Sequence, residues 1–444
     1  MQRLVNLTTK IGSGATPRGG KNAYKGGDFS LIRSQNILDF SFSYDGLVKI
    51  NNEQANALSN VEVQIGDVLL NITGDSVARC CQVDPACLPA RVNQHVCIIR
   101  PNPQLLDSTF LKYFLLETNQ KQNLLILASA GATRNALTKV MVEELEIPDF
   151  DVCQQKAIAH ILSTLDDKIE LNQKMNQTLE EIAKAIFKSW FVDFDPVCAK
   201  AEGRPTGLPP EISDLFPDEL VDSDIGEIPK GWELTTLGDH TALTKGRSYK
   251  SAELMDSDTA LVTLKSFHRG GGYRLDGLKP YTGTFKPEQV VEEGDLIIAL
   301  TDVTQAADVI GKPAIVRSST SHSQLVASLD VGIVRLKENS FFTKEFCYFL
   351  MLSNRYTHHS LGYTSGTTVL HLAKDASAKF QVSAPPIMLI ENFTDLASNL
   401  MRRIFVSEKE IEVLSELRDT LLPKLISGEL GIPDAERFLA EAGI

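Results

Sequence analysis

Residues 154–187 read QQKAIAHILSTLDDKIELNQKMNQTLEEIAKAIF, a stretch in which apolar side chains recur at heptad spacing. Two rows of residues lie seven apart, with a few polar interruptions. The first row is Ile158, Leu165, Asn172, Leu179 and Ile186, and the second is Leu162, Ile169, Asn176 and Ala183. Such a repeat over about four heptads predicts a long helix with one apolar stripe.

A second stretch of the same kind follows Pro385-Pro386. Its rows are Phe393, Leu400, Ser407, Leu414 and Leu421, and Ala397, Ile404 and Ile411. Because the two stripes have matching length, we expect the two helices to form an antiparallel coiled coil within the chain. The first stripe would be about 42 Å long at about 1.5 Å per residue. The alternative is two ordinary amphipathic helices, each packed on its own domain.

The regions before the two helices resemble one another, which indicates a pseudo-twofold internal repeat. Residues 63–73 parallel residues 291–301, residues 93–96 parallel residues 323–326, and residues 131–137 parallel residues 366–372. Both copies contain short apolar runs between Gly, Asp, Asn and Pro, which are typical of strands. Each also has a helical patch, at 110–127 and 346–356. The sequence therefore predicts two similar α+β domains separated by the two long helices.

Composition supports a globular protein of several domains. The chain has 444 residues, a hydrophobic fraction of 43% and a formal net charge of −13. Residues 1–150 and 231–384 are neutral, so the excess acid lies in the other segments, and the net charge does not exclude DNA as a partner. The sequence shows no signal peptide and no apolar run of about 20 residues, so we expect a cytoplasmic protein. The seven cysteines show no paired spacing and are expected to be free thiols.

Residues 201–231 contain five prolines and many acids, which predicts an extended connector between the copies. The tail after Gly428 is short, and we expect part of it to be disordered. The predicted division of the chain is a first globular domain, a central helix, a connector, a second globular domain, a C-terminal helix and a tail, at 1–150, 151–200, 201–230, 231–384, 385–427 and 428–444.

The chain lacks recognisable catalytic motifs. It contains no phosphate-binding G-x-x-x-x-G-K-[ST] loop and no H-E-x-x-H metal motif. Asp149 with Asp166-Asp167-Lys168 superficially matches a nuclease pattern, but these residues lie at and within the predicted helix, where we expect surface charges. Cys81, Cys87, His95 and Cys97 are spaced too loosely for an ordinary zinc site. We therefore expect no catalytic residue, no metal and no cofactor in this chain.

The predicted loops instead contain side chains suited to nucleic-acid recognition. Arg can pair with guanine, Asn or Gln can pair with adenine, and Lys and Thr suit phosphates. The candidates of the first copy are Thr16, Arg18, Lys21, Arg33, Gln35, Asn36, Thr73, Arg79, Asn93, Gln94, Thr133, Arg134 and Asn135. The candidates of the second copy are Arg247, Lys250, Lys265, His268, Arg269, Arg274, Thr301, Gln324, Thr364, Ser365, Thr367 and Thr368.

Three stretches resemble the specificity subunits of type I restriction–modification systems. Residues 154–196 are similar to their central spacer helix, residues 203–232 to the connector before the second target-recognition domain, and residues 417–428 to the end of the second spacer helix. The similarity covers almost the whole chain. The recognition domains of this family are hypervariable, so the resemblance does not say which loop residues contact bases.

The resemblance implies a non-catalytic subunit that gives a DNA-modifying complex its sequence specificity. Each target-recognition domain would bind one half of a bipartite, asymmetric site in double-stranded DNA, and the coiled coil would set the spacer. Two modification subunits would supply methyl transfer from S-adenosylmethionine, and two restriction subunits would supply ATP- and Mg-dependent translocation and cleavage. No membrane is expected as a partner. An unrecognised enzyme, a scaffold that binds protein instead of DNA, and a modification-only specificity subunit stay open as alternatives.

Overall fold

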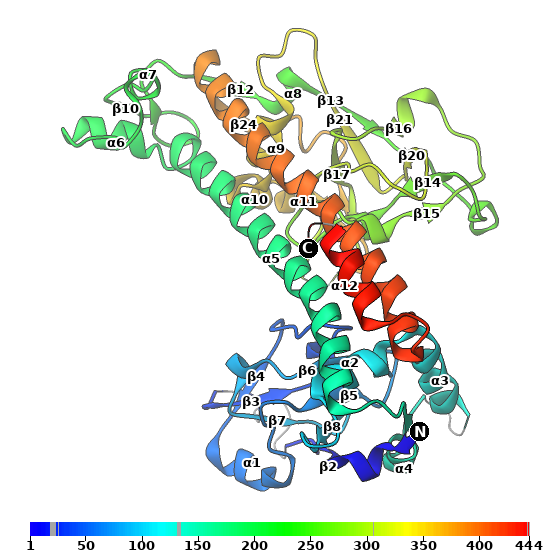
Figure 1. The fold of residues 1–444 in the computed structure, drawn as a ribbon. Coiled ribbons are helices and arrows are strands. Elements are labelled where there is room, and N and C mark those ends of the chain that lie inside the picture. Colours follow the sequence, from blue (N-terminus) through cyan, green and yellow to red (C-terminus); the bar gives the residue numbers. More distant parts are fainter. Residues whose placement is uncertain (18–23, 25, 131–134, 305, 442, 444) are drawn as a thin grey trace. The chain divides into compact units, whose positions relative to one another are not determined.

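The computed structural model describes residues 1–444 except 18–23, 25, 131–134, 305, 442 and 444. The chain forms two compact units (Figure 1). Unit 1 consists of Met1–Lys174 and Glu408–Ile444, and unit 2 consists of Met175–Ser407. Each unit contains half of each of two long helices, α5 (Val152–Phe191) and α11 (Ile387–Ser427). The long helices predicted from the heptads are therefore confirmed.

Unit 1 is built on two sheets. The first has the order β2-β8-β5-β6 and the second has the order β4-β3-β7. In the first sheet all neighbours are antiparallel, whereas β3 and β7 run parallel. The strand bounds are Gln2–Arg3 (β1), Thr8–Ser13 (β2), Phe29–Ile32 (β3), Val48–Ile50 (β4), Val68–Asn71 (β5), Cys80–Gln82 (β6), Ala90–Val92 (β7), Val96–Pro101 (β8) and Glu146–Ile147 (β9).

The first sheet of unit 1 is covered on both faces, which explains the unbroken apolar runs in its strands. Val68 and Leu70 of β5 belong to the core shared with the helices, and Leu69 between them belongs to the core shared with the second sheet. The helices of unit 1, besides its halves of α5 and α11, are α1 (Asn52–Ala57), α2 (Ser108–Leu116), α3 (Thr118–Ser129), α4 (Lys139–Glu143) and α12 (Ile432–Glu441).

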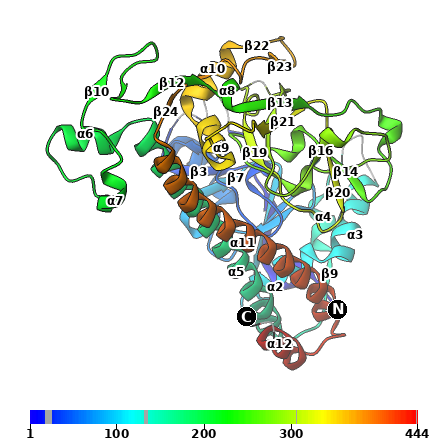
Figure 2. The same ribbon diagram turned by 90° about the horizontal axis from the view of Figure 1, so that it is seen from above.

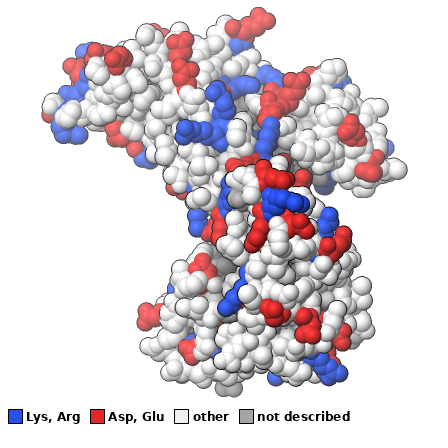
Figure 3. Space-filling view, viewed as in Figure 1, with Lys and Arg blue, Asp and Glu red and all other residues white. Residues whose placement is uncertain are grey.

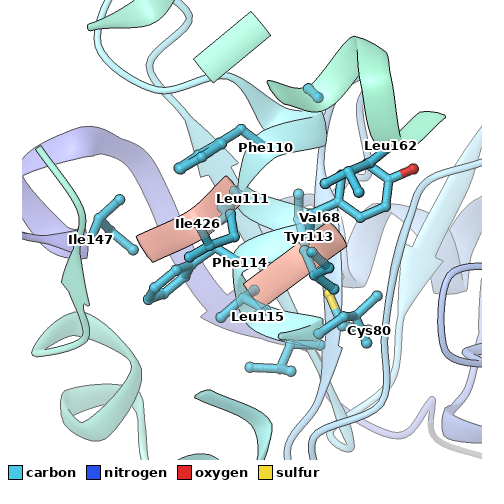
Figure 4. Packing of buried hydrophobic residues seen from close by; sticks show 14 of the residues in the cluster. Val68, Cys80, Phe110, Leu111, Tyr113, Phe114, Leu115, Ile147, Leu162 and Ile426 are labelled. Carbon is cyan, nitrogen blue, oxygen red and sulfur yellow. The ribbon is translucent and has the colours of Figure 1, made fainter. Parts of the chain in front are cut away.

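Helix α2 lies between the first sheet and the long helices (Figures 1 and 2). Figure 4 shows its residues Phe110, Leu111, Tyr113, Phe114 and Leu115 among side chains of the strands and of both long helices. Leu162 of α5 and Ile426 of α11 belong to this core. The N-terminal half of α5 therefore packs with the C-terminal half of α11, so the two helices are antiparallel here, as predicted.

Unit 2 repeats this arrangement. Its sheets have the orders β13-β21-β17-β19 and β15-β14-β20-β16, and β14 and β20 form the parallel pair. Ile297 of β17 faces the second sheet, whereas Leu296 and Ile298 face the helical core. The strand bounds are Leu220–Val221 (β10), Ile228–Pro229 (β11), Glu233–Thr236 (β12), Thr241–Lys245 (β13), Thr259–Val262 (β14), Lys279–Pro280 (β15), Val290–Val291 (β16), Leu296–Ala299 (β17), Thr301–Asp302 (β18), Pro313–Ile315 (β19), Gln324–Ala327 (β20), Val331–Leu336 (β21), Thr364–Ser365 (β22), Leu370–Leu372 (β23) and Gln381–Ala384 (β24).

Helix α9 of unit 2 takes the place of α2. It packs with aromatic residues of both long helices, because Phe187 of α5 lies 5.3 Å from Phe393 of α11 and 5.4 Å from Phe346 of α9, measured between ring centroids. The helices of unit 2, besides its halves of α5 and α11, are α6 (Asp195–Ala201), α7 (Pro210–Ser213), α8 (Leu237–His240), α9 (Lys344–Leu352) and α10 (Asn354–Gly362).

The heptad residues of both long helices face inward. Eight of the twelve residues predicted for this stripe are buried and the other four are half-buried. The buried ones are Ile158, Leu162, Leu165, Ile169, Phe393, Ile404, Leu414 and Leu421. The polar position Asn172 is also buried, and its amide donates to Glu410 Oε2 at 3.1 Å. Lys168 also pairs with Glu410 at 2.9 Å, and hydrogen bonding to Lys168 lowers the pKa of that carboxyl.

The prediction of an extended connector at 201–231 is wrong. The segment folds back onto unit 2, where Phe216 is buried and its ring lies 5.7 Å from that of Trp190. Lys200 donates to the carbonyl oxygens of Ser213 and Phe216, and β10 pairs with β11. Proline prevents a long helix here but not compaction, because burial of the few apolar residues is enough to fold the segment.

Two further expectations need correction. The tail contains α12, whose Ala435 and Leu439 are buried against the core of unit 1. Asp166, expected as a surface charge, is largely buried and accepts from Arg418, Lys112 and the Tyr113 hydroxyl. All seven cysteines are free thiols, as predicted.

Candidate nucleic-acid interface

In unit 1, the ends of four strands and the start of a fifth meet at one edge of the two sheets. Ser13 at the end of β2 is opposite Cys97, and Asn71 at the end of β5 is opposite Val96, where β8 begins. Strands β3 and β7 are parallel and end at this same edge, because the Asn93 N–H donates to the Ile32 carbonyl at 3.0 Å. We call this the polar edge of unit 1.

The polar edge brings together several residues predicted from the sequence. The Thr16 hydroxyl donates to the Gln94 side-chain oxygen, and the Gln94 amide lies 3.0 Å from His95 Nε2. The Thr73 hydroxyl bonds to the other ring nitrogen of His95. Asn135 is adjacent, since its carbonyl accepts from the Gly74 N–H at 3.1 Å. The result is a hydrogen-bonded chain of polar side chains that an approaching ligand would meet together.

Arg33, Gln35 and Asn36 lie on the loop that follows β3. Asn36 is fully buried, accepts from the Arg33 N–H at 3.0 Å, and donates to the carbonyls of Ser43 and Asp45. These bonds use its amide to shape the loop. Arg33 and Gln35 are more accessible, and Nε of Arg33 has no hydrogen-bond partner among the described residues.

The remaining candidates of the first copy are less informative. Arg79 is exposed, and its carbonyl accepts from the Asn71 N–H at 2.8 Å, which places it at the polar edge. Asn93 is buried, and its side-chain oxygen caps the His95 N–H at 3.0 Å. Arg18, Lys21, Thr133 and Arg134 lie outside the described residues.

Unit 2 has an equivalent polar edge. The Arg247 N–H donates to the Ala327 carbonyl at 2.7 Å, just beyond the end of β13. The Thr301 hydroxyl donates to Asp330 Oδ1 at 2.9 Å, where β21 begins. Thr301 is also opposite His371 in β23, which in turn is opposite Ser365 in β22. Arg247, Thr301, Thr364 and Ser365 therefore gather at one edge, and Nε of Arg247 lacks a hydrogen-bond partner among the described residues.

Other candidates of the second copy surround this edge. Lys265 and Ser266 follow the end of β14, and the Ser266 carbonyl accepts from the Arg274 N–H. The Arg274 side chain pairs with Asp276. His268 and Arg269 occupy the next turn, where Arg269 lies 3.8 Å from Asp308. Lys250 is exposed and precedes a short 3-10 helix at Ser251–Glu253, and Thr367 and Thr368 are exposed between β22 and β23.

The equivalence of residues 93–96 with residues 323–326 is wrong. Strand β8 begins at Val96 and its counterpart β21 begins at Val331, so Ser328–Asp330 takes the place of Asn93–His95. The loop between β17 and β19 is longer than the loop between β5 and β6, which shifts the register. Gln324 lies at the start of β20, away from the polar edge, beside Asp258, whose pKa is lowered by its bonds to Ser323.

Sequence reasoning missed His95 and Asp330 as members of the two edges. From the sequence, His95 was considered only as a metal ligand and Asp330 was not singled out. Both are polar residues immediately before the corresponding strands β8 and β21. The sequence comparison concealed this correspondence because it matched residues 93–96 with residues 323–326. Within the described part of the chain, no group of three or more His, Cys, Asp or Glu side chains could hold a metal ion.

Basic and acidic side chains occur together on the visible face of unit 1. On the face drawn in Figure 3, its Lys, Arg, Asp and Glu side chains are sparse and interspersed. Residues 1–150 of this unit contain equal numbers of basic and acidic residues.

Comparison with known proteins shows a consistent similarity to one kind of subunit. Residues 8–181 match the family model described as the type I restriction modification DNA specificity domain. The fold agrees, because the S subunit of the type I restriction–modification system of M. genitalium aligns with 96% of this chain and 95% of its own, with a TM-score of 0.52 and 16% identity. Residues 8–181 are thus similar to this DNA specificity domain, and the chain has the fold of such an S subunit.

Relatives extend this similarity along the chain. The specificity subunit of the type I restriction enzyme MjaIX from Methanocaldococcus jannaschii is 27% identical over 96% of this chain and 92% of its own. The specificity subunit of the type I restriction enzyme HindI from Haemophilus influenzae is 25% identical over 92% and 95%, respectively. The chain is therefore similar, over more than nine tenths of its length, to specificity subunits, the non-catalytic subunits of type I restriction enzymes. In the described residues, no helix has the length and apolar character needed to span a bilayer.

Proposed function

We propose that this subunit directs a type I complex to a bipartite, asymmetric site in double-stranded DNA. The domain at 1–150 binds one half-site through the polar edge of unit 1, and the domain at 231–384 binds the other through the polar edge of unit 2. The two long helices set the number of unread base pairs between the half-sites. Two modification subunits dock on the chain, and two restriction subunits can join them.

One observation supports this assignment above the rest. The same strand ends meet in both units, and both meeting points are lined by hydrogen-bonding side chains. Gln94 in unit 1 suits the two adjacent groups on an adenine edge, and Arg247 in unit 2 suits the two acceptors of guanine. A fold that repeats a polar edge while changing its side chains is suited to two different half-sites.

The chemistry would come from the partners. Modification subunits would bind S-adenosylmethionine and methylate adenine, and restriction subunits would use ATP and Mg to translocate and cleave DNA. In this division of labour the present chain binds, orients and spaces, and its own side chains transfer no group.

The test is methylation mapping by single-molecule sequencing in a host free of DNA methylation. The host would express the chain together with its modification subunit. We expect methyl-adenine on both strands of one split motif. Association of the two proteins without any methylated motif would refute the proposal that this chain directs the complex to a DNA sequence. DNA affinity that does not depend on sequence would favour a protein-binding scaffold.

Substitutions then assign each half-site to its unit. Gln94→Ala should relax base preference in one half-site by about 1–3 kcal/mol, and Arg247→Ala should do so in the other. Gln104→Ala is the matched control, because Gln104 is exposed beyond the opposite end of β8. If Gln94→Ala and Gln104→Ala give the same motif as the wild type, the polar edge of unit 1 does not read DNA.

A further inference from the structure

The loop of residues 33–46 connects the polar edge of unit 1 with its helices. At the edge, Arg33 donates to the Gly46 carbonyl and Gln35 donates to the Asp45 carbonyl at 3.1 Å, so both arms of the loop are tied together. Buried Asn36 adds bonds across the same arms. The loop therefore behaves as one unit, and a displacement of its tip would be transmitted to Arg33 and Gln35.

The tip of this loop is Asp39-Phe40, and it is anchored to three helices. Asp39 pairs with Lys121 of α3. The ring of Phe40 lies 6.2 Å from that of Tyr113 of α2 and 3.6 Å below the guanidinium of Arg418 of α11. Phe40 has a φ of 68°, a left-handed conformation that is unfavourable for an aromatic residue. The surrounding contacts must therefore hold this conformation in place.

Arg418 is fixed in its position over Phe40. Its Nη1 donates to Asp166 Oδ1 at 2.9 Å, and its Nε and Nη2 donate to Asp419 Oδ1 at 2.9 and 2.8 Å. Asp166 also accepts from the Tyr113 hydroxyl at 2.6 Å, and burial together with this carboxylate raises the pKa of Tyr113. Arg418 is 8% exposed, and a cation held over an aromatic ring contributes more where water is excluded.

We propose that Arg418 of α11 is a positioning residue for the first half-site. It holds the Phe40 tip of the 33–46 loop and thereby sets where Arg33 and Gln35 lie at the polar edge. Arg418 and Phe40 are 378 residues apart in the sequence. The inference rests on the proposed function. It makes the C-terminal half of α11 part of the apparatus that reads the first half-site, in addition to its role in the helix pair.

The arrangement is specific to unit 1. With the 235-residue offset between Val152 and Ile387, the first residues of the two long helices, the position of Arg418 corresponds to Ala183 of α5. Ala183 is buried in the core of unit 2 and has no cation to offer an aromatic ring. A change at Arg418 should therefore affect one half-site and spare the other, whereas a general loss of stability or assembly would affect both.

The experiment uses the complex with the modification subunit and a set of duplexes that differ from the mapped site at one base pair. Arg418→Met should lower discrimination within the first half-site by at least about fivefold, the low end of one base contact, and leave the second half-site unchanged. Arg418→Lys keeps a charge beside Asp166 but loses the planar guanidinium, so its loss should be smaller. Arg403→Met, at an exposed position of the same helix, is the control.

A second variant separates the ring contact from the backbone conformation. Phe40→Gly accepts the positive φ but removes the ring, so it should relax the first half-site as Arg418→Met does. The positioning role would be overturned if Arg418→Met left base discrimination in the first half-site unchanged while Gln94→Ala reduced it. That result would leave the proposed function intact. Equal loss at both half-sites would also overturn it. If the wild-type complex showed no base preference at the first half-site, the proposed function itself would fail.

Discussion

Asp67→Asn tests whether the Gly66-Asp67 turn, which is repeated as Gly294-Asp295 in unit 2, stabilises the first sheet of its unit. Asp67 is 0% exposed and accepts from Arg100 Nε at 2.7 Å, from Arg100 Nη2 at 2.8 Å, and from the Gln64 N–H at 2.7 Å. Asparagine replaces one of these acceptors with a donor that faces the guanidinium. Breaking a buried pair costs about 3–5 kcal/mol, and partial exposure of Arg100 places this case near 3 kcal/mol.

The same substitution in unit 2 should cost less. Asp295 pairs with Arg335 and accepts from the Glu292 N–H at 3.0 Å, but the Arg335 side chain is 43% exposed. Solvent screening reduces the expected cost of Asp295→Asn to about 1 kcal/mol. Glu144→Gln, which removes a surface pair with Arg3 at 3.1 Å, is the control and should cost about 0.5 kcal/mol.

Hydrogen exchange on the intact chain is the suitable assay, because two units make a single unfolding free energy poorly defined. A loss of about 3 kcal/mol corresponds to roughly a 150-fold fall in the protection of β5 and β8. The strands of unit 2 should keep their protection in Asp67→Asn. The reasoning is refuted if Asp67→Asn and Glu144→Gln lower the protection of β5 and β8 equally.

Two further predictions concern pH and the helix pair. Burial between Phe341 and Phe342 lowers the pKa of His240, so below about pH 6.5 the unfolded chain takes up the proton first and unit 2 should lose stability. The melting temperature of unit 2 should fall between pH 7.5 and pH 5.5 in the wild type and in the exposed-site control His160→Gln, but not in His240→Gln. An equal fall in all three proteins would disprove the role of His240. Leu165→Asp buries an unpaired charge in the core of unit 1 and should cost more than about 4 kcal/mol by hydrogen exchange in α5 and α11, with loss of modification-subunit binding. Leu171→Asp, at a site 66% exposed, should have little effect on that exchange, and a similar effect of both changes would contradict the assigned packing.

The sequence predicted the helical and sheet framework because apolar periodicity is a local property. Heptad spacing identified α5 and α11, and the buried stripe follows from it. The apolar runs around Leu69 and Ile297 predicted strands, and the structure adds that these strands are covered on both faces. Antiparallel packing followed from the need of two stripes of equal length to bury each other.

Side-chain placement at the edges was harder to predict because it depends on register. A longer loop after β17 moved the counterpart of Gln94 from Gln324 to Leu329, and a shared Gln-x-Val pattern concealed the change. Asp166 lies on a helix face that would be exposed in an isolated helix. Its burial comes from α2 and Arg418, which no local pattern connects with it.

Under the proposed function, the corrected register explains how one fold would serve two half-sites. Thr73 bonds to His95 in unit 1, and Thr301 bonds to Asp330 in unit 2, at positions that correspond in the two repeats. Both units have the threonine, and in both its partner immediately precedes the strand β8 or β21. The partner is an imidazole in unit 1 and a carboxylate in unit 2. An imidazole can donate to or accept from a base edge, but a carboxylate only accepts, as from the amino group of cytosine. Asp67 and Asp295 tie the strands of their sheets through Arg100 and Arg335. If the edges bind DNA as proposed, the residue before β8 or β21 could change the base that each edge recognises without changing the sheet.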